Sequence, residues 1–506
     1  MLAAQTSDLT LAPADVHALR EALVAADYTV AGVTEQLGQL AHAALGRNET
    51  TPGLRATTDG SPLATMTRLW QLQVPVASAD VEAALPGLLE QLCAAGVLQR
   101  SVGEVRARVD VRPYADDLRD WWVVSDLTPG LDGDQRPVAA DHVLGVSSAS
   151  STLAQLTVRE PFGNALDLGT GSGVQALHLS THCDRTVATD VNPRALAMTR
   201  LNAALNDVDV DVRSGSLFEP VSGEAFDLVV TNPPFVISPA TGERLVYRDS
   251  GLPGDEVVRR IVETAPRHLN PGGWCQIVAN WVHRETEPWQ EHLADWLDDS
   301  GCDAWVVQRE VTDPARYVEL WLADAGLRSG PEYVARYDAW MSWFAEEGVE
   351  AIGLGWVNLR RSDRDRPVAR MEDWPYAVEQ PIGPEVAAWG RRTDWLEARL
   401  DPAGGLADLD DVRVRVADDL VQETYGRPGE EDPERIVLRR QRGMRRARQV
   451  DTVEAGLVGA CDGELTVGQI LDALATLLDR DPAGLRRDYA LVVGELVEEG
   501  LVEPVG

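Results

Sequence analysis

Three motifs in the middle of the chain carry residue types and spacings that could do chemistry. The first is Asp167 with a glycine-rich turn at 169–173, the second is Asp190, and the third is Asn-Pro-Pro-Phe at 232–235. Each stands at the end of a short apolar run, and a helical pattern follows the first two, which is typical of a parallel sheet covered by helices. Ligands of such sheets lie at the carboxyl ends of the strands. We therefore expect the three motifs to meet in one cleft for a cofactor and a substrate.

The glycine turn differs from the dinucleotide fingerprint. Gly169, Gly171 and Gly173 alternate, but the G-x-G-x-x-G pattern requires glycine at the position of Val174. Glycines let a backbone approach a ligand closely, and N–H groups at a helix start can bind its polar groups. Asp190 lies close to the offset of about 20 residues at which an acidic side chain binds ribose hydroxyls. The two motifs together predict a nucleoside ligand, and the chain has no Walker pattern for a triphosphate.

The Asn-Pro-Pro-Phe motif predicts recognition of a planar nitrogen. A nitrogen conjugated to a ring or a carbonyl is a poor nucleophile. The side-chain oxygen of Asn232 and the backbone carbonyl of Pro233 can accept its two N–H bonds, which steers its lone pair and stabilises positive charge developing on it. The prolines fix the turn, and Phe235 can stack on a planar target. No acid–base residue is required, because positioning the two reactants supplies most of the effect.

With these four residues in place, the segment 165–280 resembles the class I S-adenosylmethionine-dependent N-methyltransferases. Within them it is similar to the branch that carries N-P-P followed by Phe, Tyr or Trp, the methyltransferase small domain. The resemblance implies a Rossmann-like core with a seven-stranded, mostly parallel sheet, and S-adenosyl-L-methionine as cofactor. It also implies methyl transfer to the exocyclic amine of a nucleic-acid base or to the side-chain amide of glutamine.

The resemblance also implies roles for individual residues. Asp167, Gly169 and Gly171 would hold the methionine end of the cofactor, and Asp190 would hold its ribose. Asn232 and Pro233 would hold the target nitrogen, and Phe235 its plane. The implied cofactor-binding set is Asp167, Gly169, Thr170, Gly171, Gly173, Asp190, Val191, Ser216, Leu217 and Asn232.

Ser216 departs from the family pattern. The third strand ends in G-S-L-F-E-P at 215–220, and family members usually carry an acidic or amide residue where Ser216 stands. That residue accepts a hydrogen bond from the adenine amine. Ser216 can accept one such bond.

Composition and charge bound the class of protein. The length of 506 residues predicts two to four domains, and 44% hydrophobic and 25% charged residues are ordinary for a globular protein. A formal net charge of −35 argues against a polyanionic partner. The chain contains no lysine, however, and abundant Ala, Gly, Val and Asp indicate a general compositional bias, so local basic patches are more informative than the total. We find neither a signal peptide nor an apolar run of the ~20 residues that span a bilayer, and expect a cytoplasmic protein.

Cysteine and histidine spacing predicts no metal site. The five cysteines are scattered, without a C-x-x-C pair, so neither a disulfide framework nor a thiolate zinc site is indicated. The eight histidines form no H-E-x-x-H pattern.

Four regions follow from the patterns of helices, strands and turns. Residues 1–110 read as helices over 14–26, 30–45, 62–72 and 79–95, then two short strands, which suggests a winged-helix-like domain. Residues 111–160 read as a connector or lid with a capped helix near 147–152. The methyltransferase domain occupies 161–375, where a Trp/Tyr-rich helical stretch reads as core packing. Residues 376–506 read as an α+β domain, and its pattern also suggests a winged-helix-like domain.

The sequence leaves two classes of substrate open, a base in RNA and a glutamine in a protein. A base in RNA, most plausibly ribosomal RNA, is favoured by Phe235, by the two flanks, by Arg100, Arg106 and Arg108, and by seven arginines within 435–448 that could contact an anion. A glutamine in a protein such as a release factor is favoured by the acidity and by G-S-L-F-E-P, which resembles the G-D-L-F-E-P of that subgroup. The arginines could instead pair with carboxylates of the chain. A third alternative, an inactive cofactor-binding scaffold, is disfavoured by the intact Asn-Pro-Pro-Phe motif.

Overall fold

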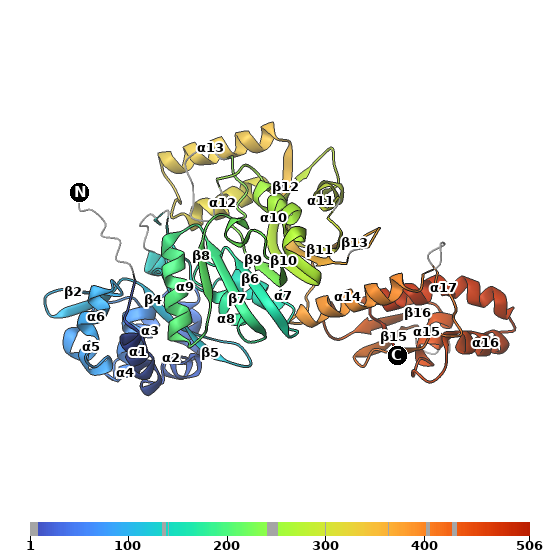
Figure 1. Cartoon of the computed structure of the whole chain (residues 1–506), viewed down its shortest axis with the longest axis horizontal. Helices are drawn as coiled ribbons and strands as arrows, with labels where there is room; N and C mark the ends of the chain where they lie inside the picture. The colour runs from blue at the N-terminus through green and yellow to red at the C-terminus, as the bar shows by residue number, and fades with distance from the viewer. Residues whose placement is uncertain are drawn as a thin grey trace. The chain divides into compact units, whose positions relative to one another are not determined.

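The structure is a computed structural model that describes residues 9–133, 138–139, 141–239, 251–298, 300–362, 364–400, 405–427 and 433–505. The chain divides into two compact units. The first comprises Met1–Ala154 and Glu160–Trp374, and the second comprises Gln155–Arg159 and Pro375–Gly506. Figure 1 labels the helices and strands of both units along the chain. No helix within the described ranges is long and apolar enough to cross a membrane.

An eight-stranded sheet forms the centre of the first unit, with the strand order β13-β11-β12-β10-β9-β6-β7-β8. The strands are β6 (Phe162–Leu168), β7 (Cys183–Asp190), β8 (Asp211–Ser214), β9 (Phe226–Thr231), β10 (Leu269–Arg284), β11 (Cys302–Thr312), β12 (Val349–Arg361) and β13 (Ala369–Asp373). The five strands from β10 to β8 are parallel, β12 is antiparallel to both neighbours, and β13 is parallel to β11. This is the Rossmann-like, mostly parallel sheet that we expected.

The sheet has one strand more than the seven we expected. The additional strand, β13, has the sequence A-R-M-E-D and lies half-exposed at the edge of the sheet. It lacks the apolar run by which the other strands are recognised. In β10, by contrast, every residue from 273 to 282 is buried. Strands covered on both faces read as continuous apolar runs, which is why they fall where the sequence predicts them.

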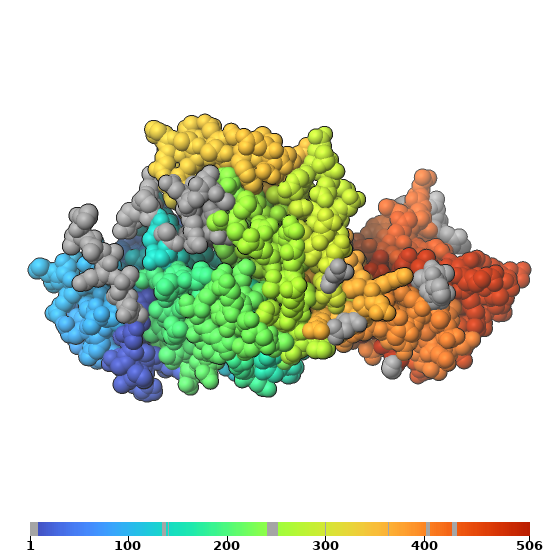
Figure 2. All heavy atoms as spheres, turned by 45° about the horizontal axis from the view of Figure 1, so that its top comes forward, coloured from blue at the N-terminus to red at the C-terminus, as the bar shows by residue number. Residues whose placement is uncertain are grey.

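Helices cover the sheet. They are α8 (Val174–Leu179), α9 (Pro193–Leu205), α10 (Glu256–Thr264), α11 (Trp289–Leu297), α12 (Pro314–Asp324) and α13 (Pro331–Glu346). Both Figure 1 and Figure 2 show α12 and α13, in yellow, side by side at the top of this unit. Trp340 and Phe344 of α13 are buried, which agrees with the prediction that this aromatic stretch packs into the core.

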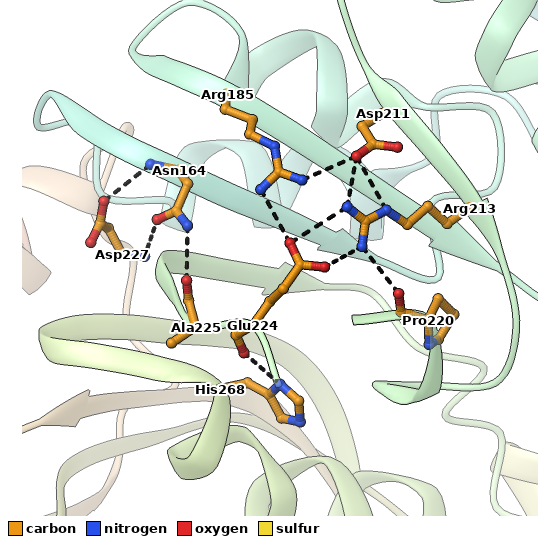
Figure 3. A network of polar contacts seen from close by, with 9 residues as sticks. All are labelled: Asn164, Arg185, Asp211, Arg213, Pro220, Glu224, Ala225, Asp227 and His268. Atoms are coloured by element: carbon orange, nitrogen blue, oxygen red, sulfur yellow. Dashed lines mark hydrogen bonds and ion pairs between the residues drawn. The ribbon is translucent and has the colours of Figure 1, made fainter. Parts of the chain in front are cut away.

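An ion-pair network joins the strands at the edge where they begin (Figure 3). Arg213 donates to Asp211 at 2.7 Å and pairs with Glu224, and Arg185 bridges the same two carboxylates at 3.1 and 3.2 Å. The arginines hold the pKa of both carboxyl groups below their usual range, through the hydrogen bonds from Arg213 above all. Asn164, at the start of β6, donates to the backbone carbonyl of residue 225 at 2.8 Å. These contacts fix the amino ends of the strands and leave the opposite edge for a site.

The N-terminal region of the first unit is mostly helical, as predicted. Its elements are α1 (Pro13–Ala25), α2 (Val30–Leu45), α3 (Thr51–Ala56), α4 (Pro62–Met66), the π-helical η1 (Thr67–Gln71), β1 (Val76–Ala77), α5 (Ser78–Ala84), α6 (Leu89–Ala94), β2 (Leu98–Arg100) and β3 (Glu104–Ala107). The single helix predicted over 79–95 is wrong: the chain leaves the helix at Leu85, before Pro86, and re-enters it as α6. The two predicted strands are β2 and β3, and β1 joins them as a third. The winged-helix-like character of this region stays a prediction.

The connector predicted at 111–160 contains a hairpin that the sequence did not reveal. Strands β4 (Asp110–Ala115) and β5 (Asp120–Ser125) pair antiparallel. Trp122 of β5, Leu201 of α9 and Leu23 of α1 belong to one buried cluster, so the N-terminal helices, the hairpin and α9 share a core. The capped helix predicted near 147–152 is α7 (Ser148–Leu156), where the Ser147 hydroxyl accepts from the backbone N–H of Ser150 at 3.1 Å.

The second unit has its own core and mixed α and β structure. Its elements are α14 (Gly383–Glu397), β14 (Val414–Val416), β15 (Leu420–Tyr425), β16 (Arg435–Arg440), β17 (Ala447–Val450), α15 (Thr452–Gly459), α16 (Val467–Leu477), α17 (Pro482–Glu498) and β18 (Val502–Pro504). The strands form a β15-β16-β17 sheet and a β14-β18 pair. The sequence predicts strands over 412–417, 434–440 and 501–504, which correspond to β14, β16 and β18, and helices over 456–460, 467–478 and 489–499, which correspond to α15, α16 and α17. Elements α14, β15 and β17 were not predicted.

Candidate active site

The glycine turn after β6 presents open backbone. Gly169 and Gly171 have φ values of +74° and +58°, and a Cβ atom on either would meet no atom within 4 Å. Gly173 (φ +83°) faces Thr199 instead, at 3.0 Å. The N–H groups of Gly169 and Thr170 donate to the carbonyl of Thr189 at the end of β7, both at 2.9 Å. The turn is therefore held to β7 while its first two glycines leave room for a ligand.

Asp167 is a buried carboxylate directly beneath this turn. Only 1% of it is exposed, and its Oδ2 accepts hydrogen bonds from the Thr170 hydroxyl (2.6 Å) and from the Ala176 N–H (3.1 Å). Burial raises the pKa of Asp167 to about 7, although the two hydrogen bonds oppose the shift. A cation next to this group would stabilise its charged form.

Asp190 ends β7 and connects the turn to the following helix. Its Oδ2 accepts from the Gly171 N–H at 3.0 Å, and its Oδ1 accepts from the Asn192 N–H at 2.8 Å. Burial raises its pKa, and these backbone hydrogen bonds lower it. The adjacent Val191 is 53% exposed, which leaves an apolar surface beside the carboxylate.

The end of β8 lies next to Asp190. The N–H of Gly215 donates to the backbone carbonyl of Asp190 at 3.1 Å. Ser216 is exposed, and Leu217 follows it with a φ of +46°. Ser216 and Leu217 are thus held at the same edge of the sheet as Asp190 and Val191.

The Asn-Pro-Pro-Phe motif begins where β9 ends. The Thr231 hydroxyl donates to the carbonyl of Leu168 at 2.7 Å, which ties this strand end to the start of the glycine turn. The Oδ1 atom of Asn232 is buried and has no hydrogen-bond partner within the described ranges. Phe235 is 8% exposed, and its ring meets the edge of Trp321 at a centroid distance of 6.3 Å. The motif therefore presents a buried acceptor without a donor, beside the open glycine turn.

Residues that the sequence did not single out support the motif from behind. The N–H of Ile237 donates to the Tyr317 hydroxyl at 2.9 Å, and Trp340 Nε1 donates to the carbonyl of Ile237 at 2.9 Å. Asn280 of β10 donates to the same Tyr317 hydroxyl at 3.0 Å. Helices α12 and α13 thus fix the chain that follows Phe235.

The β4–β5 hairpin is fixed to the other side of the site by α9. The side chain of Asn202 exchanges hydrogen bonds with the backbone of Val124 (2.7 and 2.8 Å) and donates to the carbonyl of Ser172 in the glycine turn (2.7 Å). One turn later, Asn206 exchanges the same pair of bonds with Trp122, at 2.9 and 2.8 Å. The region predicted as a lid also reaches Asn192, whose Nδ2 donates to the carbonyl of Asp141 at 2.9 Å.

All the residues predicted for the site therefore lie at one edge of the sheet, on the adjacent strands β9, β6, β7 and β8 or in the turns that follow them. Their roles toward a ligand stay predictions. Within the described ranges, no group of three His, Cys, Asp or Glu side chains is placed to hold a metal ion.

Three of the seven arginines within 435–448 pair with carboxylates of their own unit. Arg439 bonds Glu423 at 2.8 Å, Arg440 bonds Asp419 at 2.6 Å, and Arg448 reaches three glutamates at 2.7–3.4 Å. Arg435 lies over the Tyr425 ring, at 5.4 Å. Arg442 and Arg445 are exposed. In the N-terminal hairpin, Arg100 bonds Glu90 at 2.6 Å, and Arg106 is exposed.

Comparisons with known proteins find matches in three segments of the chain. Residues 144–296 match the family model of the methyltransferase small domain. Residues 25–108 and 387–504 match two domains of unknown function.

Two curated relatives are similar to the central segment. A release factor glutamine methyltransferase of Geobacter sulfurreducens is 36% identical over 132 residues, which is 24% of this chain and 46% of that protein. The ribosomal RNA small subunit methyltransferase C of Alcanivorax borkumensis is 33% identical over 138 residues, 27% of this chain and 36% of that protein. The chain thus spans less than half the length of these relatives.

Among solved structures, the 16S rRNA N2 methyltransferase of T. thermophilus in complex with AdoMet and guanosine aligns with a TM-score of 0.26 and 17% identity, over 45% of this chain and 58% of that one.

Proposed function

We propose that this protein is an S-adenosylmethionine-dependent N-methyltransferase that methylates a planar exocyclic nitrogen. The observation that carries the proposal is the buried, unpartnered Oδ1 of Asn232 at the end of β9, beside the open backbone of the glycine turn. A buried acceptor without a donor costs about 1–3 kcal/mol, so its presence indicates a ligand that brings an N–H.

The residues around the glycine turn fit the proposed cofactor. Asp167, Gly169, Thr170, Gly171 and Gly173 would hold its methionine end, where the open backbone admits a ligand and the carboxylate favours a cationic amine. Asp190 would accept hydrogen bonds from the ribose hydroxyls with the lone pairs that Gly171 and Asn192 leave free. Val191 and Leu217 offer apolar contacts for the adenine, and Ser216 offers one acceptor. When bound, S-adenosylmethionine supplies a methyl group on a sulfonium, and the target nitrogen takes it with its lone pair while the carbon–sulfur bond breaks.

The chain's own part in the reaction is to position the target. Asn232 Oδ1 and the Pro233 carbonyl would accept the two N–H bonds of the target nitrogen and stabilise the positive charge that develops on it. Phe235 would contact the plane of the target, and Trp321 holds its ring in place. The proton leaves the nitrogen after transfer, and no general base is needed because the product cation is a strong acid.

For the substrate we propose a base in RNA, with ribosomal RNA as the first candidate. The similarity to a ribosomal RNA methyltransferase over 138 residues supports this, as does an aromatic Phe at 235. The anion contact proposed for 435–448 now rests on Arg442 and Arg445, because Arg439, Arg440 and Arg448 are engaged with carboxylates. A cytoplasmic location is part of the same proposal.

The alternative is a protein glutamine, as the name of the Geobacter relative states for that protein. The 36% identity over 132 residues and the sequence G-S-L-F-E-P after β8 favour it. The pairing of three of the seven arginines within 435–448 with carboxylates also weakens one argument for RNA. An inactive scaffold is the third possibility, and the arrangement around Asn232 argues against it.

Transfer of a radiolabelled methyl group from S-adenosylmethionine into total RNA and into a protein lysate tests these possibilities in one experiment. We expect label in RNA. Label in protein alone would replace the proposed substrate by the alternative, and cofactor binding without label in either fraction would favour the scaffold.

A further inference from the structure

Asn280 carries a second unpartnered carboxamide oxygen near the proposed site. The residue is 3% exposed, and its Oδ1 is buried without a hydrogen-bond partner in the part of the chain that the structure describes. Its Nδ2 donates to the Tyr317 hydroxyl at 3.0 Å. Buried polar atoms are nearly always paired in native proteins, so this oxygen indicates a ligand donor just as Asn232 does.

The strand registers place Asn280 on the same face of the sheet as the proposed site. Four residues are paired across the parallel strands β6, β7, β9 and β10 and so share one face: Asp167, Ala188, Val230 and Gln276. Side chains alternate between faces with a period of two. Even offsets along the same strands therefore add Asp190 and Asn280 to this face, and Asn232, the first residue after β9, follows at an even offset from Val230.

The strand order places Asn280 on the substrate side. The proposed cofactor residues follow β7 and β6, Asn232 follows the next strand, β9, and Asn280 lies on β10 beyond it. Neighbouring strands are about 4.8 Å apart. A nitrogen that Asn232 holds toward the cofactor must have the rest of its molecule on the opposite side. Strand β10 lies on that side. Its residue Ile277 pairs with Thr231 at the end of β9, and Asn280 lies three residues beyond Ile277.

Tyr317 fixes the orientation of the Asn280 carboxamide. The tyrosine hydroxyl accepts from both Asn280 Nδ2 and the N–H of Ile237, which follows Phe235 in the chain. Because the nitrogen end is bonded to Tyr317, the oxygen is the end that stays available. Such an acceptor is organised before the ligand arrives, so binding costs it little reorganisation.

We propose that Asn280 determines specificity in the proposed methyl transfer: its carboxamide oxygen accepts a hydrogen bond from a ring N–H next to the methylated nitrogen and thereby selects guanine among the bases of RNA. Guanine alone has a ring N–H beside its exocyclic amine. Adenine and cytosine have an unprotonated ring nitrogen at that place, and its lone pair would repel the oxygen of Asn280. The amide of glutamine has no further donor. The inference rests on the proposed function and adds the identity of the base.

Nucleoside analysis of the RNA methylated by the wild-type protein is the first test. Methyl label in guanosine is the expected result. Label in adenosine or cytidine would overturn the role of Asn280 and leave the RNA methyltransferase proposal standing. Label only in protein, or in neither fraction, would overturn both.

Competition by free nucleosides tests the residue itself. Guanosine should inhibit the wild-type protein about 10- to 100-fold better than 1-methylguanosine, which lacks the ring N–H, because a buried acceptor left unpaired is costly. Guanosine and 1-methylguanosine should inhibit the Asn280→Leu variant, whose side chain is of similar size, equally well. The Asn280→Asp variant keeps an acceptor and should retain the preference for guanosine. A supporting variant is Tyr317→Phe, which removes the hydroxyl that orients the Asn280 carboxamide and should weaken the preference for guanosine. Equal inhibition in the wild type, or an unchanged preference in Asn280→Leu, would overturn the proposal.

Discussion

Asp167 is a buried carboxylate and Asp190 a half-buried one, and their surroundings differ. Both have a pKa raised by burial, but Asp190 accepts backbone N–H groups at both oxygens, whereas Asp167 receives its two hydrogen bonds at Oδ2. Asp167, with a pKa of about 7, is therefore close to half-protonated at neutral pH. A cationic group of the cofactor would stabilise the ionised form of Asp167. Without such a group, the buried negative charge of Asp167 destabilises the fold.

Replacing Asp167 by Asn should stabilise the protein at alkaline pH. The folded-state pKa of Asp167 lies above the ordinary value of 3.8 for an aspartate, so the folded state binds the proton more tightly than the unfolded chain. Stability is lost as the pH rises toward about 7, and Asp167→Asn removes that loss while its oxygen still accepts from Thr170 and Ala176. We expect the free energy of unfolding at about pH 8 to rise by about 2 kcal/mol, and to change little at about pH 4. Urea unfolding at both pH values measures this, and equal destabilisation at both would contradict it.

Cofactor affinity should depend on the same proton. If Asp167 holds the cationic amine of the methionine end, affinity should increase as the pH rises from about 5.5 to 7, by up to about tenfold per unit. Asp167→Asn should weaken binding about 10- to 100-fold at neutral pH and flatten this dependence. Isothermal titration calorimetry across the pH range provides the measurement. A wild-type affinity independent of pH would show that Asp167 does not meet a cation.

Among single residues, the sequence predicts those of the three motifs but not the residues that hold the motifs in place. Asp167, Asp190 and Asn232 are recognisable because each follows an apolar run at a characteristic spacing. Asn280 and Tyr317 come from segments far along the chain and are ordinary polar residues in their local sequence. Only the pairing of β9 with β10 and the packing of α12 bring them to the motif.

At the scale of elements, the β4–β5 hairpin and α9 form one support for the glycine turn. Asn202 and Asn206 lie one helical turn apart and face the hairpin. Their side-chain amides bond the backbone N–H and carbonyl groups of Val124 and Trp122, as a neighbouring strand would do. Only Asn202 reaches further, to the carbonyl of Ser172 in the turn. The two asparagines are therefore a matched pair for separating stability from binding.

Asn202→Ala and Asn206→Ala should both destabilise the fold, but only the first should impair cofactor binding. Each leaves backbone groups of the hairpin without partners, which costs about 1–3 kcal/mol. Asn202→Ala also releases Ser172, so we expect a further loss of cofactor affinity of about tenfold. Chemical unfolding and cofactor titration of both variants check this. If Asn206→Ala weakened the cofactor as much as Asn202→Ala, the contact with Ser172 would not matter.

The elements that the sequence did not reveal share a physical cause. Strand β4 contains Pro113, which disfavours a strand unless, as in this hairpin, both strands are edges. Strand β13 has no apolar run, and α14 contains Gly390 in its middle, which lowers helical propensity. All three depend on tertiary contacts, whereas the buried strands of the sheet are encoded locally by their apolar residues.

At the scale of the whole molecule, a net charge of −35 repels the phosphates of an RNA substrate. The arginines of 435–448 contribute little to offsetting this repulsion, because Arg448 alone serves Glu454, Glu495 and Glu499. Contact with RNA would have to be local and to involve few phosphates. Arg435, Arg442 and Arg445 are exposed, and because Arg435 lies over the Tyr425 ring, Arg442 and Arg445 are the first candidates to provide it.

Two sets of arginine variants should separate stability from RNA contact. Arg448→Ala removes an ion-pair partner from three carboxylates and should lower the free energy of unfolding by about 1–3 kcal/mol without changing the salt dependence of RNA binding. Arg442→Ala with Arg445→Ala should leave stability within about 0.5 kcal/mol and reduce the salt slope by about 2, because each phosphate contact contributes about 0.9. Filter binding at several salt concentrations measures the slope. An unchanged slope in the double variant would exclude these two residues from the contact.

The central claim, methyl transfer at the Asn-Pro-Pro-Phe turn, is tested most directly by Asn232→Ala. Its side chain is assigned to the target nitrogen, while the glycine turn and Asp190 are assigned to the cofactor. Binding of S-adenosylmethionine, measured by calorimetry, should therefore change by less than about threefold, and transfer of radiolabelled methyl into RNA or protein should fall by at least about 100-fold. Transfer that persists, or cofactor binding that is lost together with it, would contradict the account.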